Sequence, residues 1–173
     1  MDEMVDVVDT QNNSLGTVSK KEAHEKGLLH PCVVAMIKNS KDEWLLVKQA
    51  SDRQDAGQYV APVGGHVSSG EARDDALKRE AAEEVGFDRD FELKYLGSVV
   101  YDRHVLGRHE NHLFFMYEIH SDTEPRLNHE SESCRYFSEN ELEKELKTNP
   151  QMFGHSCHFA LRRFYPRFSE SNI

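Results

Sequence analysis

The stretch that decides the fold runs from Gly65 to Phe87 and reads GHVSSGEARDDALKREAAEEVGF. Its end, REAAEEVG, carries carboxylates at Glu80, Glu83 and Glu84. Spacings of three and four residues place these side chains on one face of an α-helix, where like charges repel each other. A divalent cation over this face would remove the repulsion, and oxygen ligands without cysteine favour Mg²⁺ or Mn²⁺. We therefore expect a metal-binding helix here.

A second face of the same helix is apolar. Leu77, Ala81 and Val85 recur every fourth residue and predict a stripe that packs on a core. Gly86 follows directly and is expected to end the helix as its C-cap. With the apolar stripe buried, the carboxylates face outward.

The segment resembles the Nudix box of the Nudix hydrolases at every fixed position, namely Gly65, Glu71, Arg79-Glu80, Ala81, Glu83-Glu84 and Gly86-Phe87. So many restricted positions make a specific motif, in contrast to a lone glycine pattern. The alternative is an acidic, solvated helix face after a glycine-rich turn. The resemblance implies an α/β/α sandwich and a metal-dependent enzyme that cleaves a diphosphate linkage in a nucleoside-diphosphate derivative or a similar small molecule.

The resemblance also implies roles for single residues. The cations would be held by Gly65, Glu80, Glu83 and Glu84, two of which, Glu83 and Glu84, are also candidate catalytic residues. Arg79, the third catalytic candidate in the box, would orient the carboxylates through a salt bridge. Glu71 would brace the loop before the helix, and Gly86 is structural. Diphosphate cleavage needs neutralised phosphate oxygens and an activated water, which bound metal ions supply.

The general base is left open by the sequence. Nudix enzymes often place an extra glutamate on a loop between the box and the C-terminal helix, and Glu130 or Glu132 in NHESESCRYF would fit. A glutamate of the box is an equal candidate. Either loop residue is alternatively an ordinary solvated charge.

A further likeness covers roughly the first two-thirds of the chain. The run DVVDTQNNSLGTVSKKEAHEKGLLHPCVV, followed later by GGHVSSGE, resembles Nudix proteins related to type 1 isopentenyl-diphosphate isomerases. Those isomerases have a metal site of histidines and glutamates. Its positions correspond in order to His24, His30, His66, Glu110 and His112, with His112 in place of a glutamate. The alternative is that these histidines are solvated surface residues.

Gly64 separates two of the possible functions. The isomerases have a cysteine at this position that transfers a proton at carbon, and glycine offers no acid or base. The box is intact here, whereas the isomerases blur it. Hydrolysis is therefore favoured, with an isomerase of prenyl diphosphates and a non-catalytic nucleotide-binding module as alternatives.

Composition narrows the setting. The chain of 173 residues has a formal net charge of −10, which disfavours bulk nucleic acid as a partner because phosphate backbones attract Lys and Arg. Three cysteines in no metal-ligand spacing fit a reduced cytosol. The acidic N-terminus predicts neither a signal peptide nor a membrane anchor. The oligomeric state is open, a homodimer included.

The chain order predicts one Nudix domain over residues 1–173, with an N-terminal extension at 1–30 and the box at 65–87. The extension should contain a β-hairpin, with strands at 4–8 and 15–18, and a short helix that ends at Gly27. The expected later strands are 31–37, 44–47, 93–101, 112–119 and 134–137. Residues 102–111 are expected to form a loop that faces ligand. Helices starting near Ser138 and at 154–165 complete a mixed sheet between helical layers.

Overall fold

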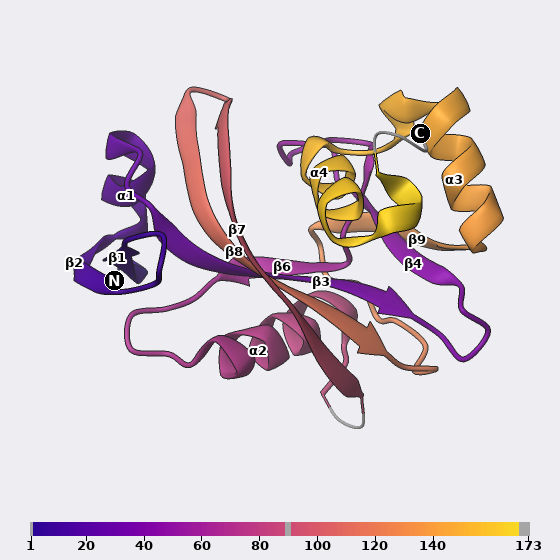
Figure 1. Cartoon of the computed structure of the whole chain (residues 1–173), viewed down its shortest axis with the longest axis horizontal. Coiled ribbons are helices and arrows are strands. Elements are labelled where there is room, and N and C mark those ends of the chain that lie inside the picture. The colour runs from indigo at the N-terminus through magenta and orange to yellow at the C-terminus, as the bar shows by residue number, and fades with distance from the viewer. Residues whose placement is uncertain (1, 89–90, 170–173) are drawn as a thin grey trace.

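A computed structural model of the protein describes residues 2–88 and 91–169 (Figure 1). The ends of the predicted domain, at residue 1 and at 170–173, lie outside these described residues, as do 89–90. Helices lie on both faces of a mixed sheet and a β-hairpin lies at the N-terminus, which confirms the predicted fold class. No described helix combines the length and the apolar composition needed to span a bilayer.

The N-terminal extension forms a small unit beside the main sheet. Strands β1 (Met4–Val8) and β2 (Ser14–Ser19) pair antiparallel in a separate two-stranded sheet. Helix α1 (Lys20–Lys26) begins after Ser19, whose side chain caps it, and ends at Gly27 in the left-handed region with φ 62°. The first turns of the chain thus follow the local signals of the sequence.

The main sheet has β3 at its centre. Its strands are β3 (His30–Lys38), β4 (Trp44–Gln49), β5 (Tyr59–Val60), β6 (Val63–His66), β7 (Glu92–Val105), β8 (Arg108–His120) and β9 (Ser131–Phe137). The order is β5-β4-β3-β8-β7, with β6 paired to β3 and β9 paired to β4. β3 and β8 run parallel, and the other pairs run antiparallel. β3 is apolar along its length because both of its faces are covered.

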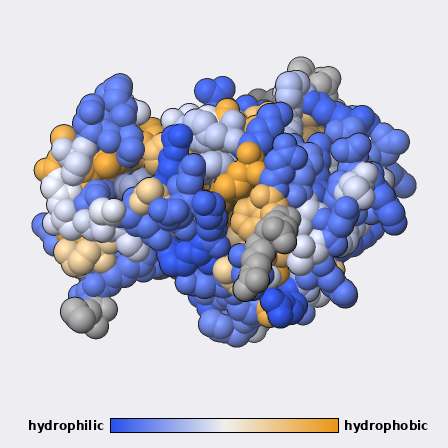
Figure 2. Space-filling view, turned by 90° about the horizontal axis from the view of Figure 1, so that it is seen from below, coloured by the Kyte–Doolittle hydropathy of each residue, from blue (hydrophilic) through white to orange (hydrophobic). Residues whose placement is uncertain are grey.

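The box helix α2 (Arg73–Val85) covers one face of the sheet. Leu77, Ala81 and Val85 are buried in a core that includes Val33 of β3. Seen from below in Figure 2, the face that carries α2 is largely hydrophilic. The helix therefore buries the apolar stripe, as predicted. The expectation that all three carboxylates face outward was wrong, because Glu83 is exposed but Glu80 and Glu84 are partly buried.

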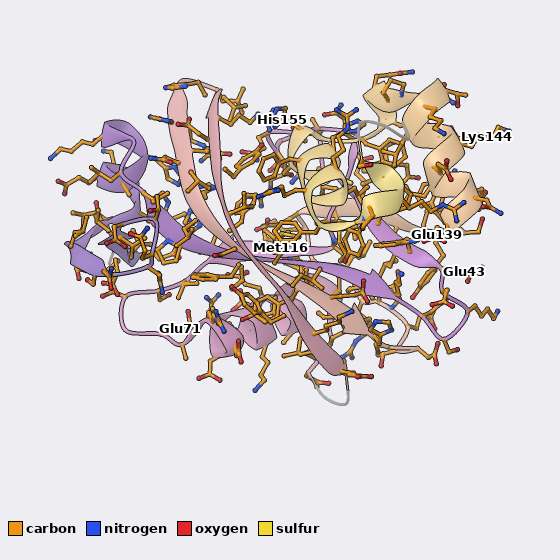
Figure 3. All side chains as sticks on the ribbon, in the orientation of Figure 1. Glu43, Glu71, Met116, Glu139, Lys144 and His155 are labelled. Atoms are coloured by element: carbon orange, nitrogen blue, oxygen red, sulfur yellow. The ribbon has the colours of Figure 1, made fainter. Side chains whose placement is uncertain are left out.

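The opposite face is covered by α3 (Glu139–Thr148) and α4 (His155–Phe164), which lie above the sheet in Figure 1. A short 3₁₀ turn, η1 (Pro150–Met152), connects the two helices, and a second one, η2 (Pro166–Phe168), follows α4. A second core forms here around Trp44 and Met36. Figure 3 marks the two layers by Glu71, below the sheet, and His155, above it.

The prediction of a loop at 102–111 was wrong. β7 continues to Val105 and β8 begins at Arg108, so that Leu106 and Gly107 alone form the turn. Both turn residues have positive φ, 50° and 75°, which suits a tight two-residue hairpin. In Figure 1 the hairpin projects beyond the sheet between α1 and α4. Its polar composition concealed the strands, since this part of the hairpin has no continuous apolar face.

Candidate functional site

A cavity of about 610 Å³ brings the box together with residues distant in sequence. α2 contributes Glu80, Glu83 and Glu84 to its wall. The rest of the wall comes mainly from β3, β6, β8 and the segment after Asn128, as well as from the N-terminal Lys20. The volume is that of a small-molecule site.

Arg79 ties the box helix to the loop and strand before it. Its Nε and Nη2 donate to the two carboxylate oxygens of Glu71, each at 2.9 Å, in a bidentate pair. Nη2 also donates to the carbonyl oxygen of His66 at 3.0 Å, and Nη1 donates to Glu80 at 2.6 Å. Glu71 in turn accepts from the backbone N–H of Ser68. The hydrogen bond from Arg79 lowers the pKa of Glu71 and keeps it ionised.

The three box carboxylates share the cavity but are held apart. Glu80 is drawn to Arg79, while Glu84 Oε2 accepts from the backbone N–H of Gly64 at 2.7 Å. Glu83 is more exposed and lies 3.8 Å from Arg79. Among the described residues, two other groups of side chains have their ligand atoms within 4.8 Å of one another. The three box carboxylates do not form such a group. Mutual repulsion and separate donors account for the spread.

Burial raises the pKa of two of these carboxyls. For Glu84 it raises the pKa to about 8, against the opposing effect of the Gly64 N–H, and the negative charges of Glu80 and Glu130 add to the rise. The pKa of Glu80 is also raised by burial, with Arg79 opposing it. Partly desolvated carboxyls of like charge favour any cation that enters.

The donor set suits a hard divalent cation. A Cβ built on Gly65 would lie 2.0 Å from Oε1 of Glu80, so only glycine leaves room for this carboxylate beside β6. Glu80, Glu83 and Glu84 supply oxygen ligands from one helix, and Gly65 could add its carbonyl oxygen. Mg²⁺ and Mn²⁺ both accept such sets.

Next to the carboxylates lies a cluster of four histidines, His24, His30, His66 and His112. Each offers a ring nitrogen, and these nitrogens lie within 4.8 Å of one another. The residues come from α1, β3, β6 and β8. The sheet register makes the cluster: His30 is directly opposite His112 in the parallel pair, and Cys32, two residues further along β3, is opposite His66.

The hydrogen bonds of the cluster leave imidazole lone pairs directed inward. Nδ1 of His30 donates to the carbonyl oxygen of Leu28 at 2.7 Å, and Nδ1 of His24 is 3.3 Å from the carbonyl oxygen of His109. A carbonyl oxygen only accepts, so these two Nδ1 atoms carry the protons. Nε2 of His24 then accepts from Nε2 of His66, which is 3.2 Å away. The buried Nε2 atoms of His30 and His112 have no hydrogen-bond partner.

Burial also keeps the four rings neutral. Desolvation lowers the pKa of His30 to about 4 and that of His112 to about 2, and it lowers the pKa of His66 and His24 as well. Neutral imidazole is the form that binds metals. Orphaned inward nitrogens and neutral rings together fit a borderline transition ion such as Zn²⁺.

Glu110, the remaining residue matched to the isomerase site, lies on the cavity wall outside this histidine group. It is buried, and it forms an ion pair with Arg108 at 3.0 Å. It lies two residues before His112 on β8 and so shares its face. Its carboxylate thus lies beside the cluster but is paired with Arg108.

The two base candidates lie differently. The segment before β9 is bound to the end of α2, because Arg126 N–H donates to the carbonyl of Val85 and Asn128 N–H to that of Glu84. This places Glu130 in the cavity wall, 3.2 Å from Arg53. Glu132 is outside the cavity wall and lies 3.7 Å from Lys48.

The sequence did not indicate several residues of the wall. Three cations, Lys20, Arg53 and Arg108, line the cavity together with Tyr101 and the buried thiol of Cys32. Burial raises the pKa of Cys32 well above its ordinary value and so keeps it a neutral thiol. Alternation along β3 could have indicated that Cys32 faces away from the α2 core, but the cations give no local signal.

Comparisons with known proteins show the family and the fold. The family described as NUDIX domain matches residues 28–157. An isopentenyl-diphosphate Delta-isomerase from Serratia proteamaculans is 33% identical over 156 residues, 88% of this chain and 86% of that protein. An uncharacterized Nudix hydrolase from Streptomyces coelicolor is 33% identical over 89 residues, 49% of this chain and 48% of that protein. The crystal structure of DR0079 from Deinococcus radiodurans is similar with a TM-score of 0.72 at 20% identity, over 94% of this chain and 99% of that one.

Proposed function

Because this chain belongs to the Nudix family, we propose that it is a pyrophosphohydrolase that uses Mg²⁺ or Mn²⁺ to cleave a diphosphate linkage in a nucleoside-diphosphate derivative or a similar small molecule. The observation that carries the proposal is the complete set of box carboxylates on the wall of one cavity, supported by Arg79. The substrate enters as an anion, and the same wall carries the cations Lys20, Arg53 and Arg108 to receive it, in addition to Arg79.

In this proposal the cation is held by Gly65, Glu80, Glu83 and Glu84. When bound, it neutralises phosphate oxygens and makes water a stronger nucleophile. Arg79 keeps Glu80 at the end of a network that begins at Glu71, so the ligand is positioned before substrate arrives.

The remaining chemistry falls to groups of the chain. Lys20, Arg53 and Arg108 bind and orient the anionic substrate. Two carboxyls are candidates to accept the proton of water, Glu84 and Glu130. Of the two loop glutamates we favour Glu130, because it lines the cavity and Glu132 does not.

We further propose that His24, His30, His66 and His112 hold a second ion of the zinc type. Support comes from the four neutral rings and the two orphaned nitrogens. Glu110 lies near this site and forms an ion pair with Arg108. The site is next to the cavity, since His66 and His112 line it.

A prenyl-diphosphate isomerase is the second candidate. The Serratia protein carries that name and aligns over most of this chain, and the histidine cluster lies where the isomerase resemblance places a metal. Against it stands Gly64, which offers only backbone atoms on β6. Cys32 is a thiol in the same cavity, but its raised pKa keeps it protonated and leaves little thiolate to act as a base.

The setting we propose is cytoplasmic, since all three cysteines are free thiols. The partner is a small diphosphate and not bulk nucleic acid, in keeping with the net charge of −10.

One experiment separates the candidates. The protein is incubated with a panel of nucleoside-diphosphate derivatives and other small diphosphates, with Mg²⁺ or Mn²⁺, and phosphate-containing products are measured. Isopentenyl diphosphate is incubated in parallel in deuterated water. Cleavage that needs the added metal, without deuterium incorporation, is the expected result. Incorporation without cleavage would make the protein an isomerase, and binding without either reaction would make it a nucleotide-binding module.

A further inference from the structure

A second group of metal-ligand side chains lies outside the cavity, on the projecting hairpin of β7 and β8. Asp102, His104 and His109 each offer one ligand atom, and these atoms lie within 4.8 Å of one another. Asp102 and His104 are exposed, and His109 is partly buried. None of the three lines the cavity.

The hairpin register brings the three side chains to one face. His104 and His109 are directly opposite each other across the two strands, and their rings stack with centroids 4.0 Å apart. Asp102 is two residues from His104 on the same strand and therefore on the same face. Its Oδ1 is 2.7 Å from Nε2 of His109.

The face is anchored to helix α1, which preorganises the group. His109 packs on Gly27, where a Cβ would lie 2.0 Å from the ring Nδ1. Nδ2 of Asn111 donates to the carbonyl oxygen of Gly27 at 3.0 Å. His24 approaches the carbonyl oxygen of His109. The position of His109 is thus set by its packing, while His104 and Asp102 are free to adjust.

Two imidazoles and one carboxylate form a donor set typical of zinc. Ligand atoms on a tetrahedral zinc ion are separated by about 3.3 Å, given bond lengths of about 2.0–2.1 Å. Small rotations of exposed His104 and Asp102 side chains would bring the three atoms from their present separation to this one. Three protein ligands leave a fourth position for water.

We propose that Asp102, His104 and His109 form a surface site for a divalent transition ion, with Zn²⁺ as the preferred occupant. The site is separate from the four-histidine cluster, although His109 contacts both: its ring belongs to the surface site and its carbonyl oxygen faces His24. It does not depend on the proposed hydrolase activity, because none of its ligands lies in the cavity wall.

The chain contains a matched control on the same strand. His120 of β8 pairs with Glu118 at 2.6 Å, as His109 pairs with Asp102 at 2.7 Å. The ligand groups found among the described residues do not include His120. An ordinary ion pair without a third ligand should not retain zinc.

Equilibrium dialysis of the full chain against Zn²⁺ tests the proposal. The number of bound ions is compared between the wild type and the variants His104→Gln, Asp102→Asn and His120→Gln, with circular dichroism as the check of folding. We expect His104→Gln to bind one ion fewer, or to bind it at least tenfold more weakly, and Asp102→Asn to weaken the same ion. His120→Gln should match the wild type. Equal stoichiometry and affinity in the wild type and folded His104→Gln would overturn the proposal, as would an equal loss in His120→Gln.

Discussion

The acidic face of α2 and the four-histidine cluster lie on one cavity but are built in opposite ways. Glu80, Glu83 and Glu84 are carboxyl side chains of one helix and are spread out, with Glu80 and Glu84 held by separate donors. The histidines come from four elements, are neutral and converge. The carboxylates therefore bind a cation because it neutralises their negative charge. The neutral histidines bind a metal ion through their lone pairs and have no charge to neutralise.

The difference predicts two kinds of metal dependence. A hard ion that balances carboxylate charge should exchange readily and act on the substrate. A borderline ion held by buried neutral rings should contribute mainly to stability. Each of the following experiments weakens one region and asks what happens to the other.

The largest effect is expected from Glu84→Gln. This change removes a carboxylate charge from the proposed metal site without removing core volume, so hydrolysis should fall roughly a hundredfold or more while the fold remains. The measurement is kcat at saturating Mg²⁺, together with thermal unfolding. Glu83→Gln is expected to act in the same way.

Asp75→Asn is the control for this loss. Asp75 is an exposed carboxylate on the first turn of the same helix, paired weakly with Lys78 at 4.0 Å. Its loss should leave turnover near the wild-type value. Wild-type turnover in Glu84→Gln would remove the acidic face from the mechanism.

The next effect is on stability and belongs to the histidines. Zn²⁺ at a hundred times its dissociation constant should stabilise the fold by about 2.7 kcal/mol, or raise Tm by roughly 5–10 °C in a protein of this size. His30→Asn should lose that shift, because His30 presents one of the orphaned buried nitrogens. Differential scanning calorimetry with and without Zn²⁺ measures it.

The second experiment is carried out in proteins that lack the proposed surface zinc site. His104→Gln is included in every protein so that the surface site does not contribute to the shift. Glu84→Gln is then the matched comparison and should keep the zinc shift that His30→Asn loses. A shift of equal size in His30→Asn would exclude the histidine cluster as the zinc site.

The same contrast explains what the sequence could and could not predict. The carboxylate face follows from spacings within one segment, and so do the cap at Gly86 and the stripe that contains Leu77. The opposition of His30 and His112 depends on a parallel register between strands far apart in the chain. No local spacing encodes that register, and only the family resemblance indicated it.

Where the resemblance gave no help, the prediction failed or was absent. Residues 102–111 read as a loop because their strands are polar on both sides, and the surface group at Asp102 was missed for that reason. The bond from Arg79 to the carbonyl of His66 depends on a side-chain conformation that the sequence does not specify. The cations Arg53 and Arg108 reach the cavity from strand ends and loops, which carry no periodic signal.

A smaller effect should follow from Gly65→Ala. The new Cβ would occupy the place of the Glu80 carboxylate, which must move, and misplacement by about an ångström costs roughly tenfold to a hundredfold in rate. The fold should tolerate the change, because the displaced atoms are the end of a flexible side chain. Rate and Tm are measured together.

Gly64→Ala is the neighbouring control. A Cβ there meets nothing closer than 3.8 Å, and the N–H that binds Glu84 is retained. Its loss of rate should be clearly smaller than that of Gly65→Ala. Equal losses would mean that the strand, and not the Glu80 position, determines the rate.

The smallest expected effect is an absence of change in the isomerase assay. Proton transfer at carbon needs an acid or base within hydrogen-bond reach, and Gly64 supplies none. We predict no deuterium incorporation from heavy water into dimethylallyl diphosphate by the wild type, and Gly64→Cys alone should not create the activity, because the substrate must also be placed to within about an ångström. If the wild type does incorporate deuterium, the variant Cys32→Ala tests the source of the proton. Loss of incorporation in this variant would assign the proton transfer to the Cys32 thiol in the cavity wall. The histidine cluster, and not the acidic face, would then carry the main reaction.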